Sequence, residues 1–161
     1  MGGELDGLEL PPARPPGRTR IAVAADAREL DLVLDLMAAE GMLEDDADRE
    51  RARRVFRSLG LGRAAPLCHY LAREDAEPVG MATAFFGGET VLLQHVVVVP
   101  ARRRRGLGRA LALARLHDAR ARGCRTAVLG PTPESRRLYE PLGFTAAPTD
   151  GSRVLYLPVG T

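Results

Sequence analysis

The sequence contains no lysine, no asparagine and no tryptophan, and aromatic residues make up only 4% of its 161 residues. All 23 basic residues are therefore arginines, a bias that we attribute to a G+C-rich coding sequence and that lowers the significance of any single arginine. Because 21 acidic residues leave a net charge of only +2, and because aromatic side chains are scarce, the composition argues against a dedicated nucleic-acid-binding protein.

Cysteines and long apolar runs are also scarce. Cys68 and Cys124 are too few for a disulfide framework or a four-cysteine zinc site, and a reducing, cytoplasmic location is the simplest interpretation. The longest apolar runs, at 21–25 and 110–114, have five residues each, whereas a membrane-spanning helix needs about 20. Residues 1–10 carry three acids and no apolar segment, which argues against a secretory signal. We therefore expect a soluble protein without a membrane partner.

What the sequence does contain is typical of one globular domain. Its hydrophobic (45%) and charged (27%) fractions exclude disorder, and 161 residues are too few for two ordinary domains. Residues 1–18 include eight glycines and prolines, so we expect an N-terminal arm followed by a single domain over 19–161. Charge is segregated, with ten acids and two arginines in 26–50 but nine arginines and one acid in 102–125.

The spacing of apolar residues predicts both helices and strands. Asp26 and Glu29 have the spacing of a capping box, and Leu30, Val33 and Leu34 then recur at helical intervals. Helices are expected over 26–41, 52–59, 107–122 and from 132 to about 141, and strands over 19–24, 66–73, 78–86, 90–99, 125–129, 144–147 and 153–157. Residues 44–48 are expected to form an acidic loop, and 149–151 a turn between the last two strands.

The segment that most clearly suggests a binding site is 103–109, which follows the expected strand ending at Pro100. It reads Arg103-Arg104-Arg105-Gly106-Leu107-Gly108-Arg109 and opens a helix. A glycine-bearing loop at a helix N-terminus presents free backbone N–H groups and the positive end of the helix dipole, which suits a phosphate or pyrophosphate. The segment is not a P-loop, because GK[ST] is absent, and Leu111 stands where GxGxxG needs its third glycine. On these residues alone, a solvated arginine cluster is an equally good interpretation.

A second segment, about 30 residues later, reads Thr132-Pro133-Glu134-Ser135-Arg136-Arg137-Leu138-Tyr139-Glu140-Pro141-Leu142-Gly143-Phe144. The first segment matches the pattern [QR]xxGx[GA] at Arg103, Gly106 and Gly108, and the second matches Tyr-x-x-x-Gly-Phe at Tyr139, Gly143 and Phe144. As an ordered pair, these patterns resemble those of the GNAT N-acetyltransferase superfamily. The resemblance extends over about 19–158, since the order of the expected elements also fits.

The resemblance implies an α/β fold with a GNAT-like mixed, mostly antiparallel central sheet. This sheet would have six to seven strands flanked by about four helices, and would be splayed between the two central parallel strands. The implied activity is acetyl-CoA-dependent N-acetyl transfer, directly to a primary amine of a small molecule or peptide. Acetyl-CoA and the amine acceptor are then the partners; no metal is expected, and a homodimer is an open alternative to a monomer. Cys68 and Cys124 would be core thiols, because direct transfer needs no nucleophilic residue.

The family pattern also implies where acetyl-CoA binds. Backbone amides of Arg104 to Arg109 would hold the pyrophosphate, and the backbone of Val97, Val98 and Val99 would pair with the pantetheine arm. The chain departs from the pattern at Thr132, where the family often has asparagine, and at Ser135, where it often has alanine. The implied acetyl-CoA residues are Val97, Val98, Val99, Arg103, Arg104, Arg105, Gly106, Leu107, Gly108, Arg109, Thr132, Ser135 and Tyr139.

Two proton transfers accompany such a reaction, and the sequence offers candidates for each. Tyr139 matches the tyrosine that protonates the departing thiolate in many relatives; the alternative is a half-buried aromatic residue at a helix end. Which group accepts the proton of the amine is left open, because Gln94 occupies the place where many relatives have a glutamate. His95 can accept a proton near neutral pH, whereas Gln94 can only orient a water molecule. Adjacent strand residues point to opposite faces, so only one of the two should reach the acceptor unless a bulge intervenes.

Gln94 also motivates a competing function. A domain that keeps the acetyl-CoA groove without a working base would be a non-catalytic acyl-CoA-binding or regulatory domain. The acceptor itself cannot be identified from the sequence. In relatives the acceptor lies against the first two helices and their connection, which here is 41–48 and is acidic. This modestly favours a cationic amine, but an ordinary solvated loop is the better interpretation of these acids.

Overall fold

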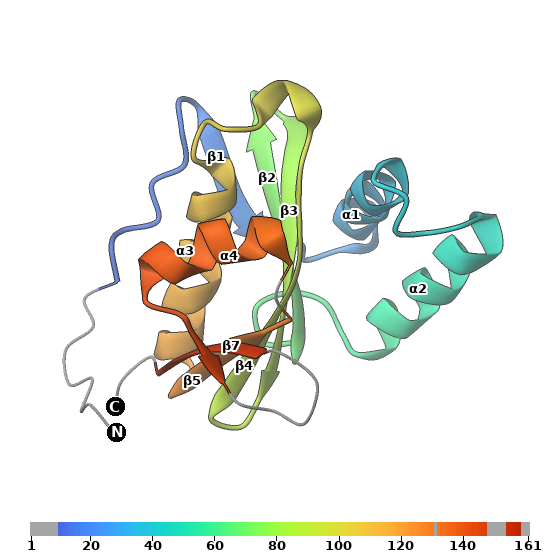
Figure 1. The fold of residues 1–161 in the computed structure, drawn as a ribbon. Helices are drawn as coiled ribbons and strands as arrows, with labels where there is room; N and C mark the ends of the chain where they lie inside the picture. The colour runs from blue at the N-terminus through green and yellow to red at the C-terminus, as the bar shows by residue number, and fades with distance from the viewer. Residues whose placement is uncertain (1–9, 131, 148–153, 159–161) are drawn as a thin grey trace.

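Figure 1 shows the computed structural model of the protein, which describes residues 10–130, 132–147 and 154–158. One mixed sheet runs through it, with the strand order β1-β2-β3-β4-β5-β7-β6. Its strands are β1 (Thr19–Val23), β2 (Leu67–Glu74), β3 (Glu77–Gly87), β4 (Thr90–Val98), β5 (Thr126–Leu129), β6 (Thr145–Ala147) and β7 (Val154–Pro158). Only β4 and β5 pair in parallel; the other neighbours are antiparallel. The expected α/β class with a mixed, mostly antiparallel sheet is confirmed.

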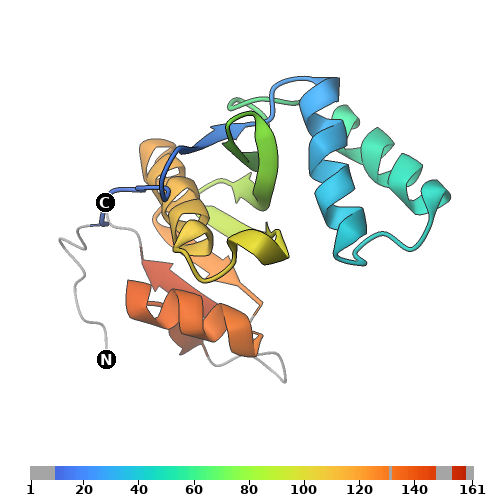
Figure 2. The same ribbon diagram turned by 90° about the horizontal axis from the view of Figure 1, so that it is seen from above.

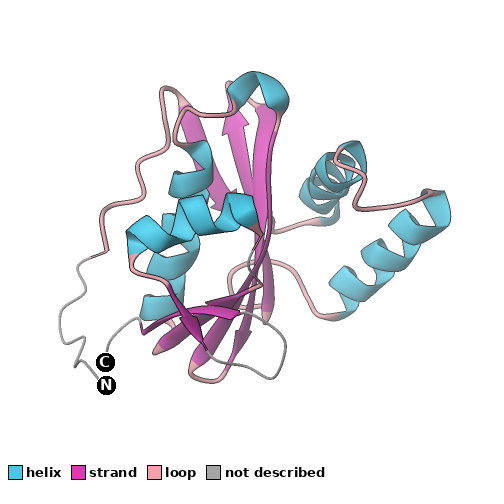
Figure 3. Ribbon diagram, viewed as in Figure 1, coloured by secondary structure: helices cyan, strands magenta, loops and turns pink. Residues whose placement is uncertain are grey.

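Helices cover both faces of this sheet (Figures 1, 2 and 3). The helices α1 (Ala27–Ala39) and α2 (Asp46–Ser58) lie on one side, and α3 (Leu107–Ala121) and α4 (Pro133–Tyr139) lie on the other. Short 3-10 turns follow β4 (Pro100–Arg102) and α4 (Glu140–Leu142). The expected turn at 149–151 lies outside the described residues.

The two faces of the sheet build two hydrophobic cores. On the α3 side, Leu111 and Leu116 pack among buried residues of β2 to β5 and of α4. On the α1 side, Leu30, Val33 and Leu34 pack against Leu71 of β2 and against β3 and β4. The strands β2 and β3 and much of β4 are therefore covered on both faces, while Gln94 and His95 of β4 stay exposed.

Local capping explains where the first two helices begin. Asp26 accepts a hydrogen bond from the Glu29 amide (2.8 Å), while the Glu29 carboxylate accepts one from the Ala25 amide (2.8 Å). The helix α2 starts earlier than expected, at Asp46, because Asp45 accepts a hydrogen bond from the Asp48 amide and caps it. The expected acidic loop at 44–48 is therefore wrong in its second half: Asp45 caps the helix, and Asp46 and Asp48 lie in its first turn, where the helix dipole favours negative charge.

The helix α2 is attached to the rest of the protein mainly through α1. None of its side chains is buried. Ion pairs join Arg49 to Asp35 (2.6 Å) and Arg53 to Asp31 (2.7 Å) across the two helices. On the opposite side, the described part of the N-terminal arm runs toward β1 beside α3, where Leu10 is buried in the core.

Candidate functional site

A β-bulge interrupts β4 at the residues that the sequence singles out for deprotonation of an amine. Ala82 pairs with Val96 and Thr83 pairs with Gln94, so His95 is the extra residue, and its φ of 41° lies in the left-handed region. Simple alternation would direct neighbouring side chains to opposite faces of the sheet. With the bulge, Gln94 and His95 are both exposed and line the same cavity.

Close to the bulge, the two parallel strands separate. Registered pairs join Thr90 to Thr126 and end with Leu92 and Val128. The strand β4 continues to Val98, whereas β5 ends at Leu129 and the chain turns toward α4. The splay that the resemblance implied is confirmed, and it leaves the second half of β4 without a strand partner on the β5 side.

A cavity of about 400 Å³ opens at this separation. Its walls come from β4, the end of β5, α4 and the connection between α1 and α2. It brings together Gln94, His95, Thr132, Ser135 and Tyr139, which the sequence nominates, with Met42 and Glu134, which it does not. Met42 lies in the segment 41–48 that was expected to border the acceptor.

Tyr139 closes the cavity from the end of α4. Its side chain is buried, with 3% of the residue exposed, and its ring contacts Phe144 edge-on at a centroid distance of 5.1 Å. Its hydroxyl is hydrogen-bonded to the guanidinium of Arg115 on α3. The hydroxyl is therefore fixed in place by a charged donor instead of being free in a half-buried ring.

The pKa values of two histidines near the bulge, His95 and His69, are lowered. The His95 residue is exposed, but its imidazole is partly enclosed in the cavity wall; this partial burial, and next the positive charge of Arg115, hold its pKa below the usual value of 6.5. His69 on β2 lies deeper: burial, and next the charge of His95, lower its pKa to about 4. Its Nδ1 lies 3.3 Å from the Thr83 hydroxyl and its ring lies against Phe56, so His69 is a structural histidine. Both imidazoles are thus neutral at pH 7.

The N-terminus of α3 has the geometry of an anion site. Gly106 is the residue before the helix and has a φ of 85°, a conformation in which glycine is free of strain. No described group accepts a hydrogen bond from the backbone amides of residues 104–109. A Cβ at Gly106 would have nothing within 4 Å, so this backbone is open to an approaching ligand. Free amides at a helix N-terminus suit an anion such as a phosphate or pyrophosphate.

The arginines of this loop differ from one another. Arg103 donates to the Val98 carbonyl (2.9 Å) and to the Glu40 carboxylate (2.8 Å), so it ties the loop to the end of α1. Arg104, Arg105 and Arg109 are exposed. The cluster is therefore partly structural, and its remaining charges lie beside the free amides.

The other residues expected to bind acetyl-CoA differ in their burial and in their hydrogen bonds. Val97 is buried against α1, while Val98 and Val99 are half-buried. The hydroxyls of Thr132 and Ser135 form a reciprocal capping box at the start of α4: Thr132 Oγ1 accepts from the Ser135 amide (3.1 Å), and Ser135 Oγ accepts from the Thr132 amide (2.6 Å). Both hydroxyl oxygens thus serve the helix cap as well as lining the cavity.

Besides Met42 and Glu134, sequence reasoning missed Arg115, which does not line the cavity but hydrogen-bonds to the Gln94 carbonyl and the Tyr139 hydroxyl. Arg115 is fully buried on α3, and only its place among Leu111, Leu113 and Leu116, on the apolar side of a helix, could have revealed it. In a chain whose basic residues are all arginines, that signal is weak. Cys68 and Cys124 are buried free thiols, and burial raises the pKa of each, as suits unreactive core cysteines.

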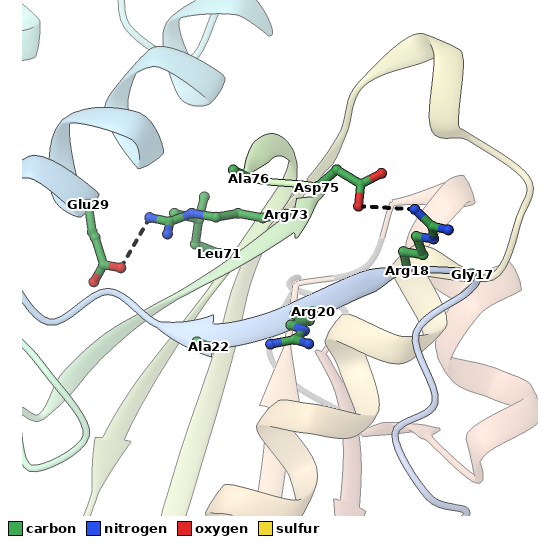
Figure 4. A pocket seen from close by; sticks show the side chains of 9 residues that line it. All are labelled: Gly17, Arg18, Arg20, Ala22, Glu29, Leu71, Arg73, Asp75 and Ala76. Atoms are coloured by element: carbon green, nitrogen blue, oxygen red, sulfur yellow. Dashed lines mark hydrogen bonds and ion pairs between the residues drawn. The ribbon is translucent and has the colours of Figure 1, made fainter.

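A second, larger cavity of about 650 Å³ lies between β1, β2 and the start of α1. Figure 4 shows its charged side chains, with Arg73 paired to Glu29 (3.1 Å) and Arg18 facing Asp75 (3.9 Å). None of the nominated site residues lines it. Within the described part of the chain, no cluster of side chains suits a metal ion, and no helix is long and apolar enough to cross a membrane.

A family model described as the acetyltransferase (GNAT) family matches residues 30–144. The chain belongs to this family. The match spans both halves of the site, from α1 through the free amides of α3 to Tyr139. Acetyl transfer from acetyl-CoA is the activity of the family. No curated protein sequence matches it.

Solved structures show the same fold. A GNAT-family protein from Desulfovibrio desulfuricans is 24% identical, with a TM-score of 0.73 over 88% of this chain and 99% of that one. A Salmonella typhimurium acetyltransferase structure with acetyl-CoA (20% identity, TM-score 0.67) covers 89% of this chain and 95% of its own. The ribosomal-protein-S18-alanine N-acetyltransferase of Escherichia coli (20% identity, TM-score 0.65) has the same coverage, 89% and 95%.

Proposed function

We propose that this GNAT protein is an N-acetyltransferase that moves the acetyl group of acetyl-CoA directly onto a primary amine of a small molecule or peptide. The observation that carries the proposal is the meeting of Gln94, His95 and Tyr139 in one cavity where β4 and β5 separate. Direct transfer needs a group that accepts a proton from the amine and one that gives a proton to the thiolate. Candidates for both line this cavity.

Acetyl-CoA binds in the opening between the strands. The free amides of residues 104–109 hold its pyrophosphate, and Gly106 and Gly108 let it approach the backbone. The pantetheine arm pairs with the backbone of Val97 to Val99, where β5 no longer does. This places the thioester beside the bulge, with Thr132 and Ser135 on the opposite wall.

The chain's own residues then move two protons. The amine loses its proton either to His95 or to a water molecule held by Gln94, and its nitrogen bonds to the acetyl carbon. The C–S bond breaks, and the thiolate takes the proton of the Tyr139 hydroxyl. The lowered pKa of His95 favours the neutral imidazole that a base requires.

The proposal is tested by incubating the protein with acetyl-CoA and a panel of primary amines while following CoA thiol release and the mass of the product. The matching alcohols are the control for transfer to oxygen. We expect CoA release with one class of amines and an increase of one acetyl group in the product mass. A non-catalytic domain, which Gln94 makes the second candidate, would bind acetyl-CoA in calorimetry and release no CoA with any amine.

A further inference from the structure

The guanidinium of Arg115 is buried, and no carboxylate of the described residues lies beside it as a counter-ion. None of the residue is exposed to solvent, and it lies among the leucines of α3. It donates hydrogen bonds to the carbonyls of Leu111 (3.2 Å), Thr83 (2.9 Å) and Gln94 (3.1 Å) and to the Tyr139 hydroxyl. No carboxylate among the described residues forms an ion pair with it. Because a buried charge with no opposite charge is unfavourable, an apolar side chain here would suit the fold better.

The hydrogen bonds of Arg115 connect three elements that surround the site: the strands β3 and β4 and the helix α4. The Thr83 and Gln94 carbonyls belong to paired residues of β3 and β4, immediately before the bulge at His95. Tyr139 belongs to α4, on the other side of the opening between β4 and β5. One side chain from α3 thus spans the bulge and the end of α4. A planar guanidinium can reach all of these acceptors at once, whereas a lysine ammonium cannot.

The chemistry of the two side chains fixes the direction of their hydrogen bond. A guanidinium has N–H donors and no acceptor, so the Tyr139 oxygen must accept. The hydroxyl hydrogen therefore points elsewhere, and the open space beside it is the cavity that Tyr139 lines. The nearby positive charge also stabilises this oxygen when it becomes negative.

We propose that Arg115 is a positioning residue for acetyl transfer, one that aims the Tyr139 hydroxyl hydrogen into the cavity and stabilises the phenolate left when that proton moves to the thiolate. The inference rests on the proposed function of Tyr139. In the balanced step, the N–C bond forms, the C–S bond breaks and the thiolate takes the Tyr139 proton. The amine's proton leaves through His95 or water, and Tyr139 regains a proton from solvent.

The charges around His95 are consistent with the proposed role of Arg115. The Arg115 charge is the second cause, after burial, of the lowered pKa of His95. The other ionisable groups around His95 are His69 on β2 and Glu134 and Tyr139 on α4. After burial, the charge of Arg115 thus adds to the lowering of the pKa of His95, while its hydrogen bond supports the acid candidate, Tyr139.

A double-mutant cycle tests the inference through turnover of acetyl-CoA. The variants are Tyr139→Phe, Arg115→Met and the two combined, each assayed with the amine of the panel above that gives the fastest CoA release. Steady-state assays give kcat and the KM for acetyl-CoA, and single-turnover assays give the rate constant of the chemical step. Since hydrogen bonds to charged groups are among the strong ones, we expect Arg115→Met to lower kcat about 10- to 100-fold when Tyr139 is present. In the Tyr139→Phe background the same change should lower kcat less than about threefold, and KM should stay within about threefold throughout.

Arg122→Met is the matched control. Arg122, at the end of α3, also donates to two carbonyls, those of Arg63 and Ala65 (both 2.9 Å), but lies away from the cavity. It should leave kcat unchanged. If Arg115→Met does not fold, the cycle is run with Arg115→Lys, which keeps the charge and should show a smaller but still non-additive loss.

The outcomes separate the inference from the function on which it rests. If Arg115→Met lowers kcat equally with Tyr139 and with phenylalanine at that position, Arg115 does not act through Tyr139 and the inference is overturned. If Tyr139→Phe alone leaves the chemical step unchanged, the proposed role of Tyr139 fails first, and the inference falls with it.

Discussion

The hydroxyl oxygen of Tyr139 accepts a hydrogen bond from Arg115, and both side chains are buried. Replacing Tyr139 with phenylalanine removes a proton donor and also leaves a buried guanidinium N–H without a partner. We expect Tyr139→Phe to lower kcat by about 10² to 10⁴ and the free energy of unfolding by about 1–3 kcal/mol. Single-turnover kinetics and urea unfolding measure the two effects.

Tyr70→Phe is the control for that variant. The Tyr70 hydroxyl is also in a buried residue and donates to the Asp118 carboxylate (2.7 Å), but Tyr70 does not line the cavity at the bulge. It should therefore lose stability and keep its turnover. An equal loss of turnover in both variants would mean that Tyr139 contributes only packing.

Binding of acetyl-CoA should depend on the backbone at Gly106. Gly106 (φ 85°) and Gly123 (φ 81°) are both left-handed, at opposite ends of α3, and a Cβ on either would have nothing within 4 Å. Alanine at either position should lower stability by about 1–2 kcal/mol through backbone strain. Only Gly106→Ala should weaken acetyl-CoA binding, because its Cβ projects where the pyrophosphate approaches. Equal affinities of the two variants in calorimetry would mean that the pyrophosphate binds elsewhere.

The pH dependence of the rate distinguishes the two routes for the amine's proton. A base must be neutral, so activity falls as the pH drops through its pKa. Because the pKa of His95 is lowered, the acid limb of the wild-type profile should lie below pH 6.5. His95→Ala should remove this limb, whereas Gln94→Ala should lower the rate and keep it. A limb that persists in His95→Ala would assign the proton to water or to the substrate.

His69 should make the fold sensitive to acid. In the unfolded chain this histidine takes up a proton near pH 6.5, but in the folded protein only near pH 4. Its contribution to stability is therefore complete above pH 6.5 and is lost as the pH falls toward 4, by about 3 kcal/mol in all. Thermal unfolding between pH 7 and pH 4 should show a shallower loss in His69→Gln. The partly exposed His117→Gln serves as control, and identical slopes in all three proteins would contradict the assignment.

The sequence predicted the parts of this structure that local chemistry determines. Turn residues and apolar spacing located the strands, and the paired motifs located the loop of Gly106 and the helix of Tyr139. It could not show that β4 contains a bulge at His95, because a bulge depends on the pairing of β3 with β4. It did not reveal Arg115 for a related reason: a single arginine on an apolar helix face has meaning only once Tyr139, Thr83 and Gln94 are known to surround it.

The attachment of α2 allows substitutions that reshape the cavity wall to accumulate separately from substitutions that affect folding. Since α2 has no buried side chain and is joined to α1 by ion pairs at Arg49 and Arg53, most substitutions on it leave the sheet and both cores intact. The connection that leads into α2 nevertheless supplies Met42 to the cavity wall. New shapes of that wall can therefore arise by substitution at little risk to folding, while the strands and α3 that build the core stay unchanged.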